Sequence, residues 1–225
     1  MIKLQEAVLL TASLCAVGFS YAALRNTAGS RHGNAVLSPN PVRLEQLIPL
    51  ADTLVAGTSG DVVVQALDYE CPPCRGHETE NRAFRAKYPK TGWLILQFPL
   101  GMHRHAYPLS LAALEADRLG AFKEFHAAVM ARPILPQESV GKYLDRVAPS
   151  LAWIGAKDLR KDEGFRKRLD TIRHLPIDGT PTYFVFRRDG ATGLTNSVRD
   201  AEAFLGAAKP TGVSEEGCRP GAECR

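Results

Sequence analysis

The sequence predicts one α/β domain in which a single sheet carries an inserted set of helices. The chain has 225 residues, of which 45% are hydrophobic and 23% charged, a composition typical of a globular protein and not of disordered, collagen-like or coiled-coil chains. Short β-branched or aromatic runs also alternate with longer stretches of helical periodicity. The net charge of +4 comes without an aromatic-interleaved basic stripe, so nucleic-acid binding is disfavoured.

The first 24 residues predict an export segment. Lys3 and Glu6 are the only charges before a run of apolar or small residues from Ala7 to Leu24. Small residues at Ser20 and Ala22 suit cleavage after Ala22. The run is also just long enough to stay as a signal anchor. The mature protein is therefore predicted to be periplasmic or otherwise extracytoplasmic, either soluble after cleavage or membrane-anchored.

The cysteines support an oxidising compartment. Cleavage would remove Cys15 and leave two close pairs, Cys71 with Cys74 and Cys218 with Cys224. Residues 25–53 are predicted to be a linker and lead-in, in which residues 43–54 form either a short helix or an extended segment. Residues 209–225 form a tail without periodicity, so the folded domain is predicted over residues 54–208.

A βαβ unit is predicted at the start of the domain. The β-branched run at 62–67 predicts a buried strand, and a helix from the cysteines to about Tyr88 follows it, with prolines at its first positions. A second buried strand is predicted over 93–98. Because a helix separates the two strands, a right-handed parallel connection is expected.

The rest of the domain is predicted to be a helical insertion over about 105–175, followed by two strands and a helix. Apolar residues between Leu109 and Val129 recur at helical spacing and predict two helices broken near Gly120. Further helices are predicted over 137–147 and 157–174, the latter with a charged, solvated face. A strand over 182–186, a turn at 188–190, a strand over 194–198 and a helix over 200–208 complete the order.

The Cys71-Pro72-Pro73-Cys74 motif predicts thiol chemistry. A cysteine at a helix N-terminus is stabilised as a thiolate, so Cys71 is the expected nucleophile and Cys74 the resolving thiol. The alternatives are an inert disulfide or half of a zinc site, although zinc would need two further ligands. Haem attachment is excluded because Arg75, not histidine, follows the motif.

Several segments together resemble the thioredoxin superfamily, and more closely its exported DsbA-like disulfide oxidoreductases. They span about residues 54–205 and read VVVQALDYECPPCR, FPL…H…A, AALEADRLGAFKEFH and GTPTYFVF. The resemblance implies a thioredoxin fold (βαβ…ββα) with a helical insertion. It also implies a cis peptide at Thr180-Pro181, packed against the cysteines and presenting the Thr180 backbone to an extended substrate. The alternative is a proline that merely starts a strand.

Two features depart from the family pattern. Gln65 stands where many thioredoxin-fold enzymes have a buried acid, so proton transfer at Cys74 would fall to water, Asp68 or Glu70. The two prolines delete two N–H donors next to Cys71, which predicts a weaker thiolate and a weaker oxidant. A reductase or isomerase role therefore competes with an oxidase role.

Histidines and the tail cysteines leave further alternatives. His103 and His105 with the cysteine pair could bind copper, but no third Cys is near in sequence. His126 is predicted to be a packed or capping residue, and His77 a surface residue. Cys218 and Cys224 form either a short structural disulfide or a shuttle pair that exchanges with the first pair.

The sequence thus predicts an exported thiol-disulfide oxidoreductase that acts on protein substrates. It needs no bound cofactor or metal, because the cysteines hold the redox equivalents, and a redox partner must reset the pair. The rival hypothesis is a non-enzymatic thioredoxin-like module that binds metal or a client protein. Stoichiometric copper binding or absence of turnover would favour that rival.

Overall fold

The computed structural model describes residues 37–156 and 162–207, and these residues form a five-stranded sheet. The strands are β1 (Asp52–Val55), β2 (Val62–Leu67), β3 (Gly92–Gln97), β4 (Thr182–Phe186) and β5 (Thr192–Thr195), in the spatial order β1-β3-β2-β4-β5. The predicted export segment and the cysteines at 15, 218 and 224 lie outside the described residues.

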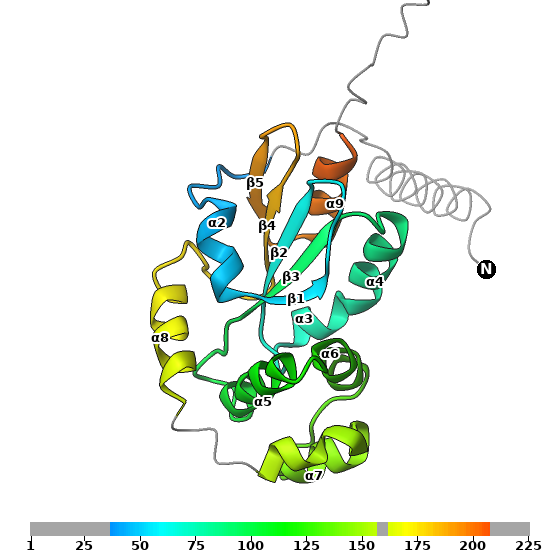
Figure 1. The fold of residues 1–225 in the computed structure, drawn as a ribbon, viewed down its shortest axis with the longest axis vertical. Helices are drawn as coiled ribbons and strands as arrows, with labels where there is room; N and C mark the ends of the chain where they lie inside the picture. Colours follow the sequence, from blue (N-terminus) through cyan, green and yellow to red (C-terminus); the bar gives the residue numbers. More distant parts are fainter. Residues whose placement is uncertain (1–36, 157–161, 208–225) are drawn as a thin grey trace, which may run out of the picture. The chain divides into compact units, whose positions relative to one another are not determined.

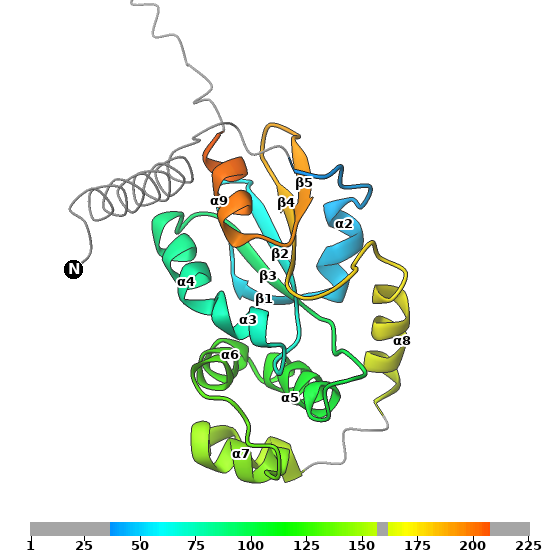
Figure 2. The ribbon, with the colours of Figure 1, turned by 180° about the vertical axis from the view of Figure 1, so that it is seen from behind.

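Helices cover both faces of the sheet. The helical segments are α2 (Leu44–Leu47), η1 (Ile48–Leu50), α3 (Pro72–Gly76), α4 (Glu78–Lys87), α5 (Ala106–Arg118), α6 (Phe122–Ala131), α7 (Val140–Val147), η2 (Pro149–Ala156), α8 (Glu163–Ile172) and α9 (Val198–Gly206). In Figures 1 and 2, α2 and α8 lie on one side of the sheet and α4 and α9 on the other. The helices α5, α6 and α7 gather at the end of the sheet where α3 begins.

The central strand β2 divides the core by its alternation. Val63 and Leu67 pack with the α4, α6 and α9 side, whereas Val64 and Ala66 pack with the α2 and α8 side. Five of the six residues of β2 are buried. This burial on both faces explains why the run is continuously apolar, as predicted for a central strand.

The predicted βαβ unit is confirmed. β2 and β3 are parallel with Val62 opposite Gly92, and α3 and α4 connect them. β4 pairs with β2 and β5 with β4, both antiparallel. The predicted turn between β4 and β5 contains Gly190 at φ 85°, which glycine adopts readily. β5 starts two residues earlier than the predicted strand at 194–198.

One strand differs from the prediction. Residues 43–54 were expected to form a short helix or an extended segment, but they form α2, η1 and the start of the edge strand β1. The predicted domain boundary at residue 54 therefore falls inside β1. Asp52 is fully buried there because Arg168 of α8 binds its carboxylate at 2.6 Å and Gln97 donates to it at 2.9 Å. Partners so distant in sequence leave no local signal.

The helical regions also differ from the prediction in three places. The predicted single helix after the cysteines is broken at His77, where α3 ends and α4 begins. The two insertion helices α5 and α6 do break as predicted at Gly120, which has φ 71°. The charged face predicted over 157–174 is not entirely exposed to solvent, because Arg168 points inward and binds Asp52. The helix at 137–147 starts only at Val140, capped by Ser139.

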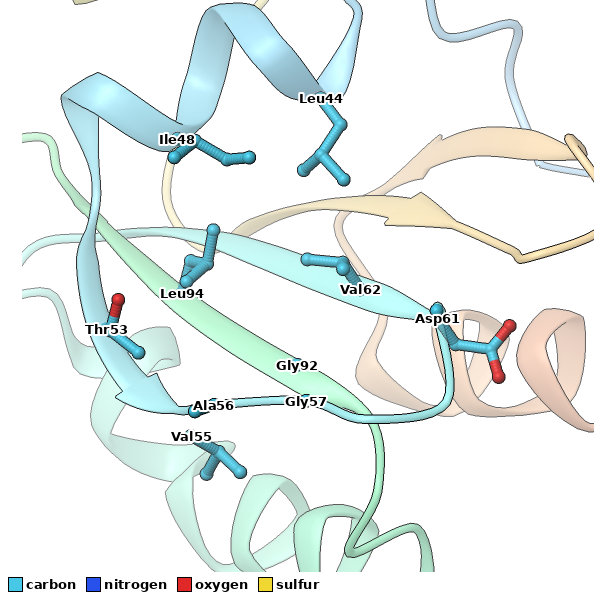
Figure 3. A pocket seen from close by; sticks show the side chains of 11 residues that line it. Leu44, Ile48, Thr53, Val55, Ala56, Gly57, Asp61, Val62, Gly92 and Leu94 are labelled. Atoms are coloured by element: carbon cyan, nitrogen blue, oxygen red, sulfur yellow. The ribbon is translucent and has the colours of Figure 1, made fainter.

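An apolar cavity of about 310 Å³ lies at the N-terminal end of β2. Figure 3 shows Leu44 and Ile48, from α2 and η1, pointing toward Leu94 on β3. Cys71 follows the opposite end of β2, so this cavity does not belong to the thiol site. Among the described residues, no helix has the length and apolar character that a bilayer crossing needs.

Candidate active site

The two motif cysteines lie where β2 meets α3. Cys71 is the N-cap residue of α3, and Cys74 lies in its first turn. Both are free thiols and both are buried, Cys71 with 4% of its surface exposed and Cys74 with none. Cys71 is thus the outer of the two residues, and Cys74 is the more buried.

The environment of Cys71 favours its thiolate. The hydrogen bond from the Cys74 thiol is the largest cause, and together with the Thr180 side chain and the Cys74 backbone it outweighs burial and lowers the pKa of Cys71 to about 6. The Cys74 backbone supplies the first N–H that the two prolines leave available. The negative charge of Asp68 acts in the opposite direction.

Cys74 has the opposite tendency. Burial raises the pKa of Cys74 far above its ordinary value, and the hydrogen bond to Cys71 raises it further. The outer sulfur therefore holds negative charge while the inner one holds the proton. This division suits a nucleophile and a resolving thiol.

Thr180 and Pro181 lie directly against Cys71. Their peptide bond is cis, as the resemblance implied, and the Cys71 thiol donates to the Thr180 carbonyl at 3.1 Å. The Thr180 hydroxyl is buried without a hydrogen-bond partner among the described residues. It is therefore free to turn toward the sulfur when Cys71 ionises. Asn196 donates to the Pro181 carbonyl at 2.8 Å and fixes this turn.

Gln65 lies in the core below the motif. It is fully buried, and its side-chain oxygen accepts from Trp93 Nε1 at 3.3 Å. Its Nε2 has no partner among the described residues. A side-chain amide does not ionise at ordinary pH, so this position does not supply the acid that many thioredoxin-fold enzymes carry.

Asp68 and Glu70, the two acids before the motif, each hold a histidine. Asp68 Oδ2 accepts from His103 Nδ1 at 2.8 Å, and Glu70 Oε1 accepts from His105 Nδ1 at 2.8 Å. Glu70 also accepts from the His105 backbone N–H. The histidines considered as copper ligands are therefore engaged with carboxylates. Among the described residues, no group of three or more Cys, His, Asp or Glu side chains is arranged to hold a metal ion.

A third histidine binds the residue between those two acids. Tyr69 is fully buried, and its hydroxyl lies 3.3 Å from His126 Nδ1. His126 is thus packed, as predicted, and its other nitrogen lies 3.9 Å from Glu78. Burial raises the pKa of Glu78, but His126 and the charge of Arg85 outweigh it and lower the pKa below its usual value.

Arg75, directly after the motif, ties the same loop to α6. Its guanidinium donates to the Tyr69 carbonyl at 2.9 Å and to the carbonyls of Val129 and Met130 at 3.0 and 3.2 Å. Loop 68–70 is therefore bonded to the helical insertion through three histidines and one arginine. The sequence singled out His103, His105 and His126 but not these pairings.

These features define a class of protein. A cysteine pair at the start of a helix, a cis-proline turn against the outer sulfur and a βαβ…ββα sheet with inserted helices are features of the thioredoxin fold. The fold predicted from the sequence is confirmed. The second predicted pair, Cys218 and Cys224, lies outside the described residues.

Several solved structures have a fold similar to that of this chain. A thioredoxin-like oxidoreductase from Silicibacter pomeroyi DSS-3 has a TM-score of 0.55 at 21% identity and matches 72% of this chain and 95% of its own. The catalytic domain of Proteus mirabilis ScsC has a TM-score of 0.57 at 19% identity, over 72% of this chain and 92% of its own. A periplasmic thioredoxin-like protein from Salmonella enterica serovar Typhimurium has a TM-score of 0.54 at 17% identity, over 73% and 96%.

The chain therefore has the fold of the DsbA-like thioredoxin-fold oxidoreductases. Further structures of this kind include a thiol-disulfide exchange protein from Wolbachia pipientis and BdbD from Bacillus subtilis. No family model matches the sequence, and no curated protein matches it at a significant level.

Proposed function

We propose that the protein is an exported thiol-disulfide oxidoreductase that exchanges disulfides with protein substrates through Cys71 and Cys74. The observation that carries this proposal is the division of protonation between the two sulfurs: the surroundings lower the pKa of Cys71 to about 6 and raise that of Cys74. An inert staple or a zinc knuckle would not require that division. The DsbA-like fold supports the same class of activity.

In the reducing direction, the Cys71 thiolate attacks one sulfur of a substrate disulfide. The substrate S–S bond breaks, one substrate sulfur leaves as a thiolate, and a mixed disulfide forms at Cys71. Cys74 then loses its proton and attacks the Cys71 sulfur, which releases the second substrate thiolate and forms the Cys71–Cys74 disulfide. The pair has then given two electrons to the substrate. The oxidising direction is the reverse sequence.

Thr180 and Pro181 form the proposed substrate groove. The Thr180 carbonyl lies 3.1 Å from the Cys71 sulfur, so an extended chain bound along this turn would bring its own cysteine to Cys71. Main-chain hydrogen bonds of this kind tolerate many sequences. This suits an enzyme that acts on unrelated protein substrates.

The ionisation of Cys71 bears on the direction of reaction. Its pKa of about 6 lies between those of a strong oxidant such as DsbA, about 3.5, and of thioredoxin, about 7. An oxidant owes its strength to a stabilised reduced form. We therefore place this pair closer to the isomerase and reductase end of the scale, where a partner must keep it reduced.

Export is supported by the first 24 residues and by the two close cysteine pairs that remain after cleavage, as expected for an oxidising compartment. One of the similar structures is described as a periplasmic protein. We propose that the domain acts outside the cytoplasm, either released or anchored by that segment. A soluble or membrane redox partner would then reset the cysteine pair.

The deciding experiment is the reduction potential of the Cys71–Cys74 pair in glutathione buffers, measured on the full chain with Cys15→Ser, Cys218→Ser and Cys224→Ser. We expect a value of roughly −180 to −230 mV, as for protein disulfide isomerase and glutaredoxins. A value near −120 mV would assign disulfide donation and contradict the proposed direction. Absence of a reversible disulfide would favour a non-enzymatic client-binding module.

A further inference from the structure

The loop before Cys71 contains a buried carboxylate that the exchange reaction does not consume. Asp68 has no exposed surface. Its Oδ1 accepts from the Glu70 N–H at 2.7 Å, and its Oδ2 accepts from the Leu100 N–H and from His103, both at 2.8 Å. These three hydrogen bonds fix the carboxylate in the loop.

A backbone hydrogen bond connects Asp68 to the nucleophile. The Cys71 N–H donates to the Asp68 carbonyl at 3.2 Å, so the two residues belong to one turn. The buried Asp68 carboxylate therefore lies in the same turn as Cys71, and two like charges in one turn, away from bulk water, repel each other. Consistent with this, the charge of Asp68 raises the pKa of Cys71 and so opposes the groups that lower it.

We propose that Asp68 is a positioning residue that sets the direction of thiol exchange, because its fixed negative charge opposes the negative charge on the Cys71 sulfur. This inference rests on the proposed function and deepens it. Destabilising the thiolate destabilises the reduced pair relative to the disulfide, which makes the protein a weaker oxidant. Asp68 thus biases the pair toward the reducing direction.

The neighbouring pair provides a matched control. Glu70 carries the same charge, lies one residue before Cys71 and also binds a histidine, at 2.8 Å. Unlike Asp68, its side chain is partly exposed, at 18% compared with 0%. Solvent screens an exposed charge more than a buried one. The field that Cys71 experiences should therefore come mainly from Asp68.

The test compares Asp68→Asn with Glu70→Gln in the full chain carrying serine at positions 15, 218 and 224. Two quantities are measured: the rate of Cys71 alkylation by iodoacetamide at pH 5, and the exchange equilibrium constant with glutathione. For Asp68→Asn we expect both to change roughly three- to tenfold, faster alkylation and a more oxidising pair. For Glu70→Gln we expect changes below about twofold.

A purely structural role for Asp68 predicts a different result. Asp68→Asn would then lower the melting temperature of the reduced protein. The alkylation rate and the exchange equilibrium constant would change no more than they do in Glu70→Gln, and that result would overturn the proposal. If Asp68→Asn does not fold, His103→Lys keeps an N–H donor and places a cation against the carboxylate. That variant should make the glutathione exchange equilibrium at pH 7 more oxidising, because lysine stays charged there, and an unchanged equilibrium would reject the inference.

The alkylation measurement does not depend on turnover. If the parent protein showed no exchange with glutathione, the proposed function would fail, while the alkylation ratio would still report on the charge of Asp68. The two proposals can therefore fail separately.

Discussion

The two ends of strand β2 differ in chemistry. At its N-terminal end, the apolar cavity is lined by backbone and aliphatic side chains, and its one charged side chain, Asp61, accepts from the Arg188 N–H at 2.9 Å. At its C-terminal end, within five residues, the chain buries a carboxylate, a phenol and a thiol at Asp68, Tyr69 and Cys71. One regular strand connects these two environments.

The difference shows where this fold holds its chemistry. Asp68, Tyr69 and Cys71 each have a hydrogen-bond partner from another part of the chain, namely His103, His126 and Thr180. Buried polar groups without partners destabilise a fold, so this end requires the helical insertion. The N-terminal end requires only close backbone packing. Changes at the C-terminal end of β2 should therefore alter the thiol chemistry. Changes at the N-terminal end should alter only the stability of the fold.

The largest effect is expected from removing the nucleophile. Cys71→Ser should abolish disulfide exchange, because serine is not ionised at neutral pH and cannot form a mixed disulfide. Cys74→Ser should instead trap substrate at Cys71 as a stable adduct. Insulin reduction and mass spectrometry of the adduct measure the two outcomes. Substantial turnover by Cys71→Ser would show that another thiol carries the reaction.

The second expected effect is a pH dependence confined to the reduced protein. Because the pKa of Cys71 is lowered from 9.0 to about 6 in the folded state, its ionisation stabilises the fold increasingly as pH rises from about 6 to 9, and this stabilisation is lost as pH falls through 6. The gain is at most a few kcal/mol. Melting temperatures of the reduced and oxidised forms at pH 5, 7 and 9 measure it.

The oxidised form is the control for that experiment, since a disulfide has no thiol to ionise. The difference in melting temperature should shift in favour of the reduced form between pH 5 and 9. A difference that does not change with pH would contradict the lowered pKa of Cys71.

The third expected effect concerns the opposite end of β2. A Cβ at Gly57 would lie 2.2 Å from the Gly92 nitrogen, so the backbone must move to admit it. Gly57→Ala should therefore destabilise the protein by about 1–3 kcal/mol while leaving Cys71 alkylation at pH 5 unchanged. Gly101→Ala, where a Cβ meets no atom within 4 Å, is the control. A changed alkylation rate in Gly57→Ala would mean that the two ends are coupled.

The smallest effect is expected from one hydroxyl at the thiol end. Thr180→Val keeps the shape and the carbonyl but removes the hydroxyl that helps to lower the pKa of Cys71. Alkylation at pH 5 should slow by roughly two- to tenfold. Thr192→Val, at an exposed position of β5, should leave the rate unchanged. Equal rates in both variants would rule out a role for the hydroxyl.

Local patterns predicted most of the fold. The β-branched run of β2, the break between α5 and α6 at Gly120 and the turn at Gly190 are confirmed because each depends on neighbouring residues. The strand β1 was missed because it is four residues long and its buried Asp52 depends on Arg168, 116 residues away. Distant ion pairs of this kind have no periodicity to detect.

The candidate site divides in the same way. The spacing of Cys71 and Cys74 after a strand, and the Gly-Thr-Pro-Thr segment before another, identified the sulfurs and the turn beside them. The sequence could name Asp68, Glu70 and three histidines as titratable residues. It could not pair them, because their partners come from elements up to 57 residues apart.

The sequence by itself determined the order of the elements, the identity of the two thiols and the turn that faces them, since these depend on local spacing and on residue type. Only the tertiary structure decided how far the two thiols differ, because it lowers the pKa of Cys71 to about 6 and raises that of Cys74. Protonation depends on burial and on the distances to Cys74, Thr180 and Asp68. Such distances exist only once α3 and the turn at Thr180 have packed against the end of β2.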